Sequence, residues 1–332
     1  MPRMTNRVLT TVVVGIAISC LFPTSMNAGP GSGRANGNDC PSCVADFALY
    51  DPSYEDDGVW EEEVTALKAM FAAYGFTYKI ISAKEINAGS LGSGSSRKYR
   101  ALIEPGGWAY YRNVLVKSAG ENYIRSFINS GGNYVGFCAG AWNACKIVSW
   151  DQNGTGSYQD YYYDLKLFTG TGKGPLGWLP WENGTNPDLD EVKINTGNGT
   201  MKKIGIPAKT RFFYAGGPWF IPSGTLSKYE VWARASKPAG ASNTDGDGQP
   251  TIVKYAYGSG TVILFAYHPE ILIDSMVDNV KLSQYYKEDQ IDWSTGTQTM
   301  DQINLQSWNI VHAALQIAAK KTVTKITKLP GE

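Results

Sequence analysis

Apolar residues in this chain alternate between short runs and helically spaced positions. Short runs rich in aromatic and β-branched residues predict strands at Ala45–Tyr50, Thr77–Ile81, Tyr99–Ile103 and Tyr134–Phe137. Between the first two runs, residues 59–74 place apolar side chains at alternating spacings of four and three, which predicts an amphipathic helix. The first half of the chain therefore combines strand and helix patterns in turn.

A second helix is predicted at Glu121–Asn129, where Ile124, Phe127 and Ile128 share one face. Strands that alternate with helices in this way are typical of a parallel sheet with helices on both faces. We therefore expect an α/β fold with a mostly parallel sheet.

Residues 149–214 break this alternation. They are rich in Gly, Asn, Tyr and Trp, and they contain only short β-like runs such as Glu191–Ile194. We expect an irregular insertion with short antiparallel strands over one edge of the sheet. Beyond it, the pattern predicts three more strands and a long final helix, at Tyr229–Ala235, Thr251–Tyr257, Thr261–Tyr267 and Gln302–Lys320. Neither a repeat nor a second domain is evident.

The strand at Tyr134–Phe137 runs directly into Cys138, which lies between Gly136 and Gly140. Residues 139–148 are compatible with a helix, so the segment has the strand–turn–helix context of a nucleophile elbow. Glycines permit the close backbone approach that such a turn needs, and a helix N-terminus favours thiolate over thiol. The alternative is a buried cysteine packed as a small hydrophobic residue.

A thiol nucleophile needs a base, and the chain has two histidines. His312 lies beside the apolar stripe of the last predicted helix, which indicates a structural or surface role. His268 follows a predicted strand, where active-site groups gather in parallel sheets. Glu270 is placed to accept the second ring N–H of His268 and to fix its tautomer. Cys138, His268 and Glu270 are therefore the candidate catalytic residues. The alternative for His268 is a surface residue at the end of a strand.

The turn Pro105-Gly106-Gly107 follows another strand of the same predicted sheet. Backbone N–H groups of Gly106 and Gly107, with that of Ala139 after the cysteine, are candidates for an oxyanion hole.

The balance of basic and acidic residues argues against strongly charged partners. The 30 basic residues balance 30 acidic ones, so we expect neither nucleic-acid nor membrane-surface binding. Twenty Tyr and ten Trp suit a cleft that faces carbohydrate or peptide, and they equally suit a large secreted core. We expect no metal and no cofactor, because no ligand motif is complete.

The first 28 residues have the pattern of a secretory signal peptide: Arg3 and Arg7 precede an apolar run, with Pro23 and small residues after it. We expect cleavage near Ala28, a flexible leader at 29–44, and a secreted protein without a membrane span. Three sequons in polar, Gly-rich stretches support export and predict glycosylation at Asn153, Asn183 and Asn198.

Four cysteines remain once Cys20 leaves with the signal peptide. Cys40 and Cys43 are expected to form a local disulfide or to pair elsewhere in an oxidising compartment. Cys145 is two helical turns beyond Cys138 if the helix continues, a separation of roughly 10 Å that no disulfide spans. Cys138 is therefore expected to be a free thiol.

Three segments together resemble a known family. Pro105-Gly-Gly107, Gly136-Phe-Cys-Ala-Gly140 and His268-Pro-Glu270 are similar to the class I glutamine amidotransferase pattern. Residues 131–142, 214–218 and 260–270 resemble more closely the amidotransferase-like N-terminal domain of eukaryotic biotin–protein ligases and its exported stand-alone relatives.

The resemblance implies a flavodoxin-like three-layer α/β sandwich over residues 45–321, followed by a tail at 322–332. It also implies a Cys-His-Glu triad made of Cys138, His268 and Glu270. Nothing in the chain resembles the ligase catalytic domain, and no synthetase domain follows to receive ammonia.

Three hypotheses follow. The first is an exported thiol-dependent enzyme that hydrolyses a carboxamide or peptide bond through a thioester, with a small amide or peptide as substrate. The second is a non-catalytic module that binds a glycan or peptide on the same fold. The third, an exported structural protein with a vestigial triad, is disfavoured because all three chemical groups are retained.

Overall fold

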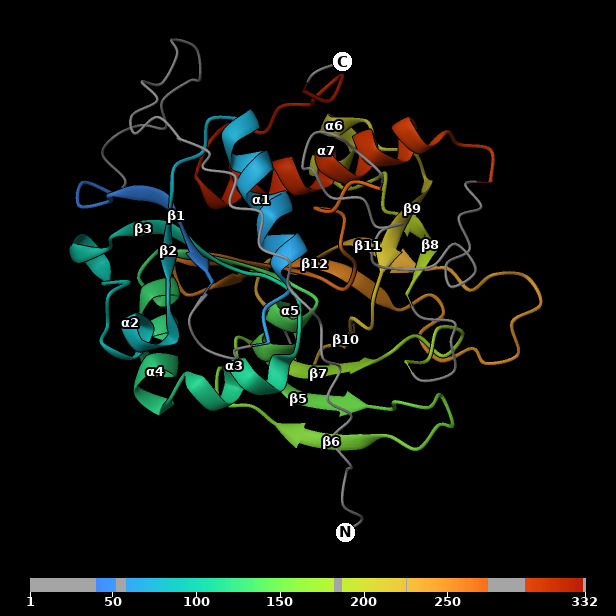
Figure 1. Cartoon of the computed structure of the whole chain (residues 1–332), viewed down its shortest axis with the longest axis horizontal. Helices are drawn as coiled ribbons and strands as arrows, with labels where there is room; N and C mark the ends of the chain where they lie inside the picture. Colours follow the sequence, from blue (N-terminus) through green and yellow to red (C-terminus); the bar gives the residue numbers. More distant parts are fainter. Residues whose placement is uncertain (1–39, 52–57, 182–186, 225, 274–295, 331–332) are drawn as a thin grey trace, which may run out of the picture. The chain divides into compact units, whose positions relative to one another are not determined.

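The architecture is a large sheet with helices on both faces and a smaller sheet beside it (Figure 1). The computed structural model describes residues 40–51, 58–181, 187–224, 226–273 and 296–330. These residues belong to one compact unit, 33–332. The predicted signal peptide and residues 29–39 of the predicted leader lie outside the described residues.

The large sheet holds nine strands in the described residues. Their order is β2 (Tyr78–Ile81), β1 (Ala45–Tyr50), β3 (Tyr99–Glu104), β4 (Asn133–Phe137), β13 (Gly260–Phe265), β12 (Pro250–Tyr257), β11 (Glu230–Ala235), β8 (Asp188–Ile194) and β9 (Lys209–Tyr214).

The first five of these strands are parallel neighbours, and the pairs from β13 to β9 are antiparallel. Antiparallel alternation returns β11 and β9 to the direction of β13, so seven strands point one way and two the other. The order β2-β1-β3-β4-β13 is the flavodoxin-like 2-1-3-4-5 order. The expected α/β fold with a large, mostly parallel sheet is confirmed.

Side-chain alternation along the strands separates two cores. Phe47, Val135 and Phe137 point to the face covered by α1 (Glu61–Ala73) and α7 (Met300–Ala318), whereas Ala48 and Tyr134 point to the opposite face. The helices of the opposite face are α2 (Ala83–Asn87), α3 (Ala109–Leu115), α4 (Ser118–Asn129) and α5 (Ala139–Ala144) (Figure 1). The other helical elements within the described ranges are η1 (Gly94–Ser96) and α6 (Gly199–Ile204).

The helix expected to run to Val148 ends at Ala144. Residues 145–150 instead form β5, because Ile147 and Val148 are β-branched and the segment pairs with β6 (Gln159–Tyr162) and β7 (Phe168–Gly174). The premise that placed Cys145 two helical turns from Cys138 was therefore wrong. Both thiols are nevertheless free, and Cys145 donates to the Ala141 carbonyl at 3.3 Å.

The predicted insertion is more regular than the sequence indicates. β5, β6, β7 and β10 (Trp219–Ile221) form a separate four-stranded sheet, whereas β8 and β9 extend the large sheet. The expectation of an irregular segment over one edge is corrected accordingly. Its high Gly, Tyr and Trp content obscured the period-two pattern.

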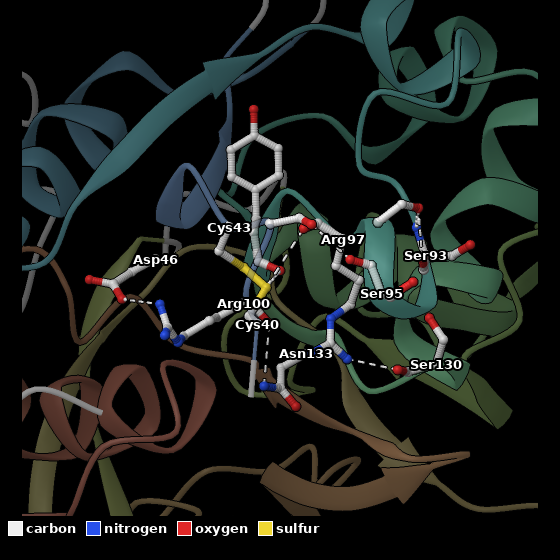
Figure 2. Close-up of a disulfide and its surroundings, with 12 residues drawn as sticks. Cys40, Cys43, Asp46, Ser93, Ser95, Arg97, Arg100, Ser130 and Asn133 are labelled. Carbon is white, nitrogen blue, oxygen red and sulfur yellow. Dashed lines mark hydrogen bonds and ion pairs between the residues drawn. A yellow bond between two sulfur atoms is a disulfide. The ribbon is translucent and has the colours of Figure 1, made fainter. Parts of the chain in front are cut away.

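Both predicted flanking segments are packed where they are described. Residues 40–44 are held by the Cys40–Cys43 disulfide and by a hydrogen bond from Val44 N–H to the Lys98 carbonyl. Figure 2 shows this disulfide beside Arg97 and Arg100, and the local pairing of the two cysteines is confirmed. Residues 40–44 are therefore no flexible leader.

At the other end, Ile326 and Leu329 join the core, and Ile326 N–H donates to Asn309 on α7. The predicted tail is therefore part of the domain as far as residue 330. None of the described helices has the length and apolar character that a membrane crossing requires.

A buried charge network ties α3 and α4 to the end of β3. Arg112 reaches Glu104 at 2.9 Å and Glu121 at 2.6 Å, and all three side chains are at most 4% exposed. The hydroxyl of Tyr134 lies 2.8 Å from Glu104 Oε2 and 2.6 Å from the Gly140 carbonyl, and its single proton serves one of them at a time. The network therefore extends to the turn that holds Cys138.

Replacing Arg112 tests this network. The variant Arg112→Met leaves Glu104 and Glu121 buried beside each other without a positive charge, so we expect a loss of about 3–5 kcal/mol in the free energy of unfolding. Denaturant titration measures the loss. Lys209→Met, which removes an exposed ion pair with Glu191, is the control and should cost less than about 1 kcal/mol. Equal losses in the two variants would show that the buried network does not stabilise the fold.

Candidate functional site

Cys138 has the backbone of a nucleophile elbow. Its φ of 41° and ψ of −99° are strained for a residue with a Cβ, and it immediately precedes α5. Its N–H donates to the Phe265 carbonyl at the end of β13. A Cβ on Gly140 would lie 2.3 Å from the Glu104 carbonyl oxygen, so this glycine permits the close approach of α5 to β3.

His268 lies beside Cys138 and is completely buried. A Cβ on Gly106 would lie 2.6 Å from His268 Cε1 and 3.1 Å from Cys138 Cβ, so both residues flank this one glycine. The indole of Trp60 packs edge-on against the imidazole with ring centres 5.0 Å apart. The turn after β13 thus brings the predicted thiol and base together although 130 positions separate them.

The Nδ1 atom of His268 faces two carboxylates. It is 3.0 Å from Oε1 of Glu270, as expected, and 3.1 Å from Oε2 of Glu63 on α1. Both carboxylates are fully buried. With Nδ1 protonated, the ring donates to these oxygens, and Nε2, which has no hydrogen-bond partner in the described part of the chain, remains for the thiol.

Glu63 was not predicted from the sequence. It occurs in a run of three glutamates that reads as the solvated start of a helix. The feature of the sequence that could have identified Glu63 is its spacing. Glu63 lies three residues after Trp60 and four before Leu67, which places it on the buried stripe of the helix. A carboxylate on an apolar stripe needs a buried partner.

The titratable groups of the site lie close enough to shift one another's pKa. Burial lowers the pKa of His268, but the electrostatic influence of Cys138 and the hydrogen bonds with Glu270 and Glu63 raise it well above its ordinary value. Burial, and then the negative charge of Glu63, raise the pKa of Glu270. Glu63 Oε2 also accepts the Gly106 N–H, so this oxygen faces two donors, the backbone of Gly106 and the ring of His268.

One predicted oxyanion donor is already occupied. The N–H of Gly106 donates to Glu63 Oε2 at 2.6 Å, so it is not available to a substrate oxygen. Gly107 lines the same cavity as Cys138, and the N–H of Ala139 is at the first position of α5, where helices offer no internal acceptor. Gly107 and Ala139 therefore remain the candidate donors.

The segment after β9 forms the opposite wall. The Sγ atom of Cys138 lies 3.4 Å from the Ala215 carbonyl oxygen, and the Trp142 indole N–H donates to the Gly216 carbonyl at 3.0 Å. A cavity of about 720 Å³ opens here and is lined by Cys138, His268 and aromatic side chains from the small sheet, the helices α3 and α5 and the loops. The predicted insertion thus supplies part of the site.

Glu63, His268 and Glu270 also have the composition of a metal site. One donor atom from each lies within 4.8 Å of the others. Their ligand types suit a divalent ion such as zinc.

The remaining predicted residues lie elsewhere. His312 is buried against Tyr74 at 4.4 Å between ring centres, and burial lowers its pKa to about 4, which indicates the structural role. Asn153 is exposed, whereas Asn198 caps α6 and donates its amide to Glu230, so a glycan there would break that hydrogen bond. Asn183 lies outside the described residues.

Comparison with known proteins identifies the family. Residues 54–329 match the family described as "Biotin-protein ligase, N terminal". The chain belongs to this family. The expected resemblance is confirmed, and the match covers both the elbow and His268. A search of curated proteins finds no match.

Several solved structures are similar to the chain. A glutamine amidotransferase is 19% identical, with 72% of this chain and 95% of that chain covered and a TM-score of 0.43. A glutamine amidotransferase from Thermotoga maritima is 12% identical, with 83% and 96% covered and a TM-score of 0.40. A putative ThuA-like protein from Parabacteroides merdae is 13% identical, with 85% and 92% covered and a TM-score of 0.46. Such scores say nothing about the activity of this chain.

Alkylation distinguishes the two free thiols. At pH 7 we expect iodoacetamide to label Cys138 and not Cys145, which is completely buried and whose pKa burial raises. His268→Gln should slow labelling of Cys138 at least about tenfold, because the imidazolium that stabilises the thiolate is lost. The difference in labelling rate between the variant and the wild type should narrow near pH 9.5. Mass spectrometry of the labelled peptides measures both rates.

The matched control is His312→Gln, which replaces the other histidine. It should leave the labelling rate of Cys138 unchanged. A rate that His268→Gln does not alter would mean that the imidazole does not activate the thiol.

Proposed function

We propose that this chain is a thiol-dependent hydrolase of a carboxamide or peptide bond. The observation that carries the proposal is the buried arrangement of Cys138, His268 and its two carboxylates at one end of a cavity. A strained cysteine beside an imidazole with a raised pKa is the combination that nucleophilic catalysis requires.

The reaction would proceed in two displacements. The Cys138 thiolate attacks the carbonyl carbon, and its charge passes to an oxygen near Gly107 and Ala139. His268 Nε2–H protonates the leaving nitrogen as the C–N bond breaks, which leaves a thioester and a neutral imidazole. The imidazole then takes a proton from water, the hydroxide attacks the thioester, and the acid and the thiolate are released beside a restored imidazolium.

The carboxylates hold the imidazole in this orientation. Glu63 and Glu270 accept the Nδ1–H, which fixes the tautomer and stabilises the positive charge. Glu63 is the stronger candidate for the charged partner, because it also accepts the Gly106 N–H. The expected partner is a small amide or a peptide, and no cofactor enters the scheme.

Export is part of the proposal. The Cys40–Cys43 disulfide supports an oxidising compartment, as does the exposure of the sequon residue Asn153. The alternative function is a non-catalytic module that binds a glycan or peptide, and the large aromatic cavity supports it as well.

Turnover decides between these functions. In a panel of peptide amides and carboxamides, Cys138→Ala should abolish release of ammonia or amine by the intact protein. Glu63→Gln should lower kcat by about 10²–10⁴-fold, because it removes the charge that supports the imidazolium. Glu270→Gln should have a smaller effect, because glutamine resembles the protonated acid that burial and Glu63 favour.

Glu191→Gln, on the exposed ion pair with Lys209, is the control and should not change kcat. A chelator should also leave kcat unchanged, and a loss on chelation would assign the Glu63–His268–Glu270 cluster to a metal. Ligand binding by wild type and by Cys138→Ala without any turnover would favour the binding module.

A further inference from the structure

The cavity beside Cys138 is walled by tryptophan. Five of the tryptophans in the described residues line it: Trp60, Trp108, Trp142, Trp150 and Trp181. Four of them form a continuous series of ring contacts. The ring centres are 5.7 Å apart from Trp142 to Trp150, 6.3 Å from Trp150 to Trp181, and 5.6 Å from Trp181 to Trp108.

This wall is built from separate parts of the fold. Trp142 belongs to α5, Trp150 ends β5, and Trp108 precedes α3. The indole N–H of Trp142 is already occupied by the Gly216 carbonyl, so this side chain offers only apolar surface. At the outer end, Trp108 is 56% exposed and leaves ring surface free at the mouth of the cavity.

The described lining carries no Asp, Glu, Lys or Arg. Its polar side chains are His268, Gln152, Cys138 and three tyrosines, Tyr110, Tyr161 and Tyr163, and the hydroxyl of Tyr161 already donates to Gln159. A free amino acid such as glutamine brings an ammonium and a carboxylate, and burying either without a partner is costly. A sugar could stack on the aromatic rings, but each of its several hydroxyls needs a polar partner, and the few uncharged groups of the lining satisfy only some of them. A neutral substrate with a large flat apolar group loses little hydration free energy when it enters the cavity.

We propose that this cavity binds the part of the substrate next to the scissile carboxamide, and that this part is neutral and aromatic. The inference rests on the proposed hydrolase function for its catalytic meaning. A volume of about 720 Å³ lies in the range of sites that enclose drug-sized ligands, and aromatic groups stack favourably on aromatic walls. Substrates of this class include amides of peptides that present an aromatic side chain to the series of tryptophans.

Affinity labels with one shared reactive group test the preference. The probes are chloroacetamide, its N-naphthylmethyl derivative, its N-carboxymethyl derivative and N-chloroacetylglucosamine, and the readouts are kinact and KI for Cys138. The naphthylmethyl probe should have a KI at least about 10-fold below those of the charged and sugar probes, which corresponds to one well-stacked aromatic contact. A lower KI for either of those two probes would overturn the proposal.

Substitutions of a lining tryptophan test where in the cavity the preference for aromatic probes arises. Trp108→Ala should reduce the ratio of naphthylmethyl to carboxymethyl reactivity at least about fivefold, and Trp108→Phe should restore most of it. Tyr123→Leu removes an exposed aromatic side chain of α4 outside the lining and should leave the ratio unchanged. A ratio that Trp108→Ala does not alter would contradict an aromatic subsite at the mouth.

Binding separates this proposal from the hydrolase proposal. Calorimetry with the Cys138→Ala protein compares N-acetyl-naphthylalanine amide with glutamine and with N-acetylglucosamine, and it needs no reactive thiol. If Cys138 resists every label and the aromatic amide still binds most tightly, the hydrolase proposal fails and the aromatic site stands. If Cys138 is labelled but glutamine or the sugar binds more tightly, the aromatic site fails and the hydrolase proposal stands.

Discussion

The candidate site depends on one buried histidine that lies between acidic groups on two sides. His268 has a thiol on one side and the carboxylates of Glu63 and Glu270 on the other, all shielded from water. An imidazolium in such a place is stable only while its counter-charges stay close. Gly106 makes that proximity sterically feasible, because any side chain at this position would collide with Glu63 and His268.

Distant parts of the sequence must meet for this arrangement to form. Helix α1 contributes Glu63, β4 leads into Cys138, and β13 leads to His268. The hydroxyl of Tyr134 connects the elbow at Gly140 to the buried ion network on α3 and α4. The segment after β9 closes the site with the carbonyl of Ala215. Packing of the whole domain therefore sets the geometry of the reacting groups.

The sequence predicts the part of this architecture that local patterns encode. Short apolar runs mark the parallel strands, and the glycines around Cys138 mark the elbow, since both are consequences of neighbouring residues. Glu63 escaped prediction because its partner is 205 positions away. The helix expected through Val148 was wrong because pairing with β6 and β7 overrides a helix-compatible composition. Occupation of the Gly106 N–H by Glu63 is likewise a tertiary contact that no local pattern reveals.

The charge of His268 is the central claim, and a nitrogen-15 NMR titration of the two histidines tests it most directly. We predict that His268 remains an imidazolium at pH 7.5 in the wild-type protein, well above the ordinary titration near 6.5. In Cys138→Ala it should lose its proton at a lower pH, because the thiolate charge is the leading cause that raises its pKa. His312, with a pKa of about 4, should already be neutral at pH 6 and serves as the internal reference. A wild-type His268 that is neutral at pH 7.5, or that titrates identically without the thiol, would contradict the account.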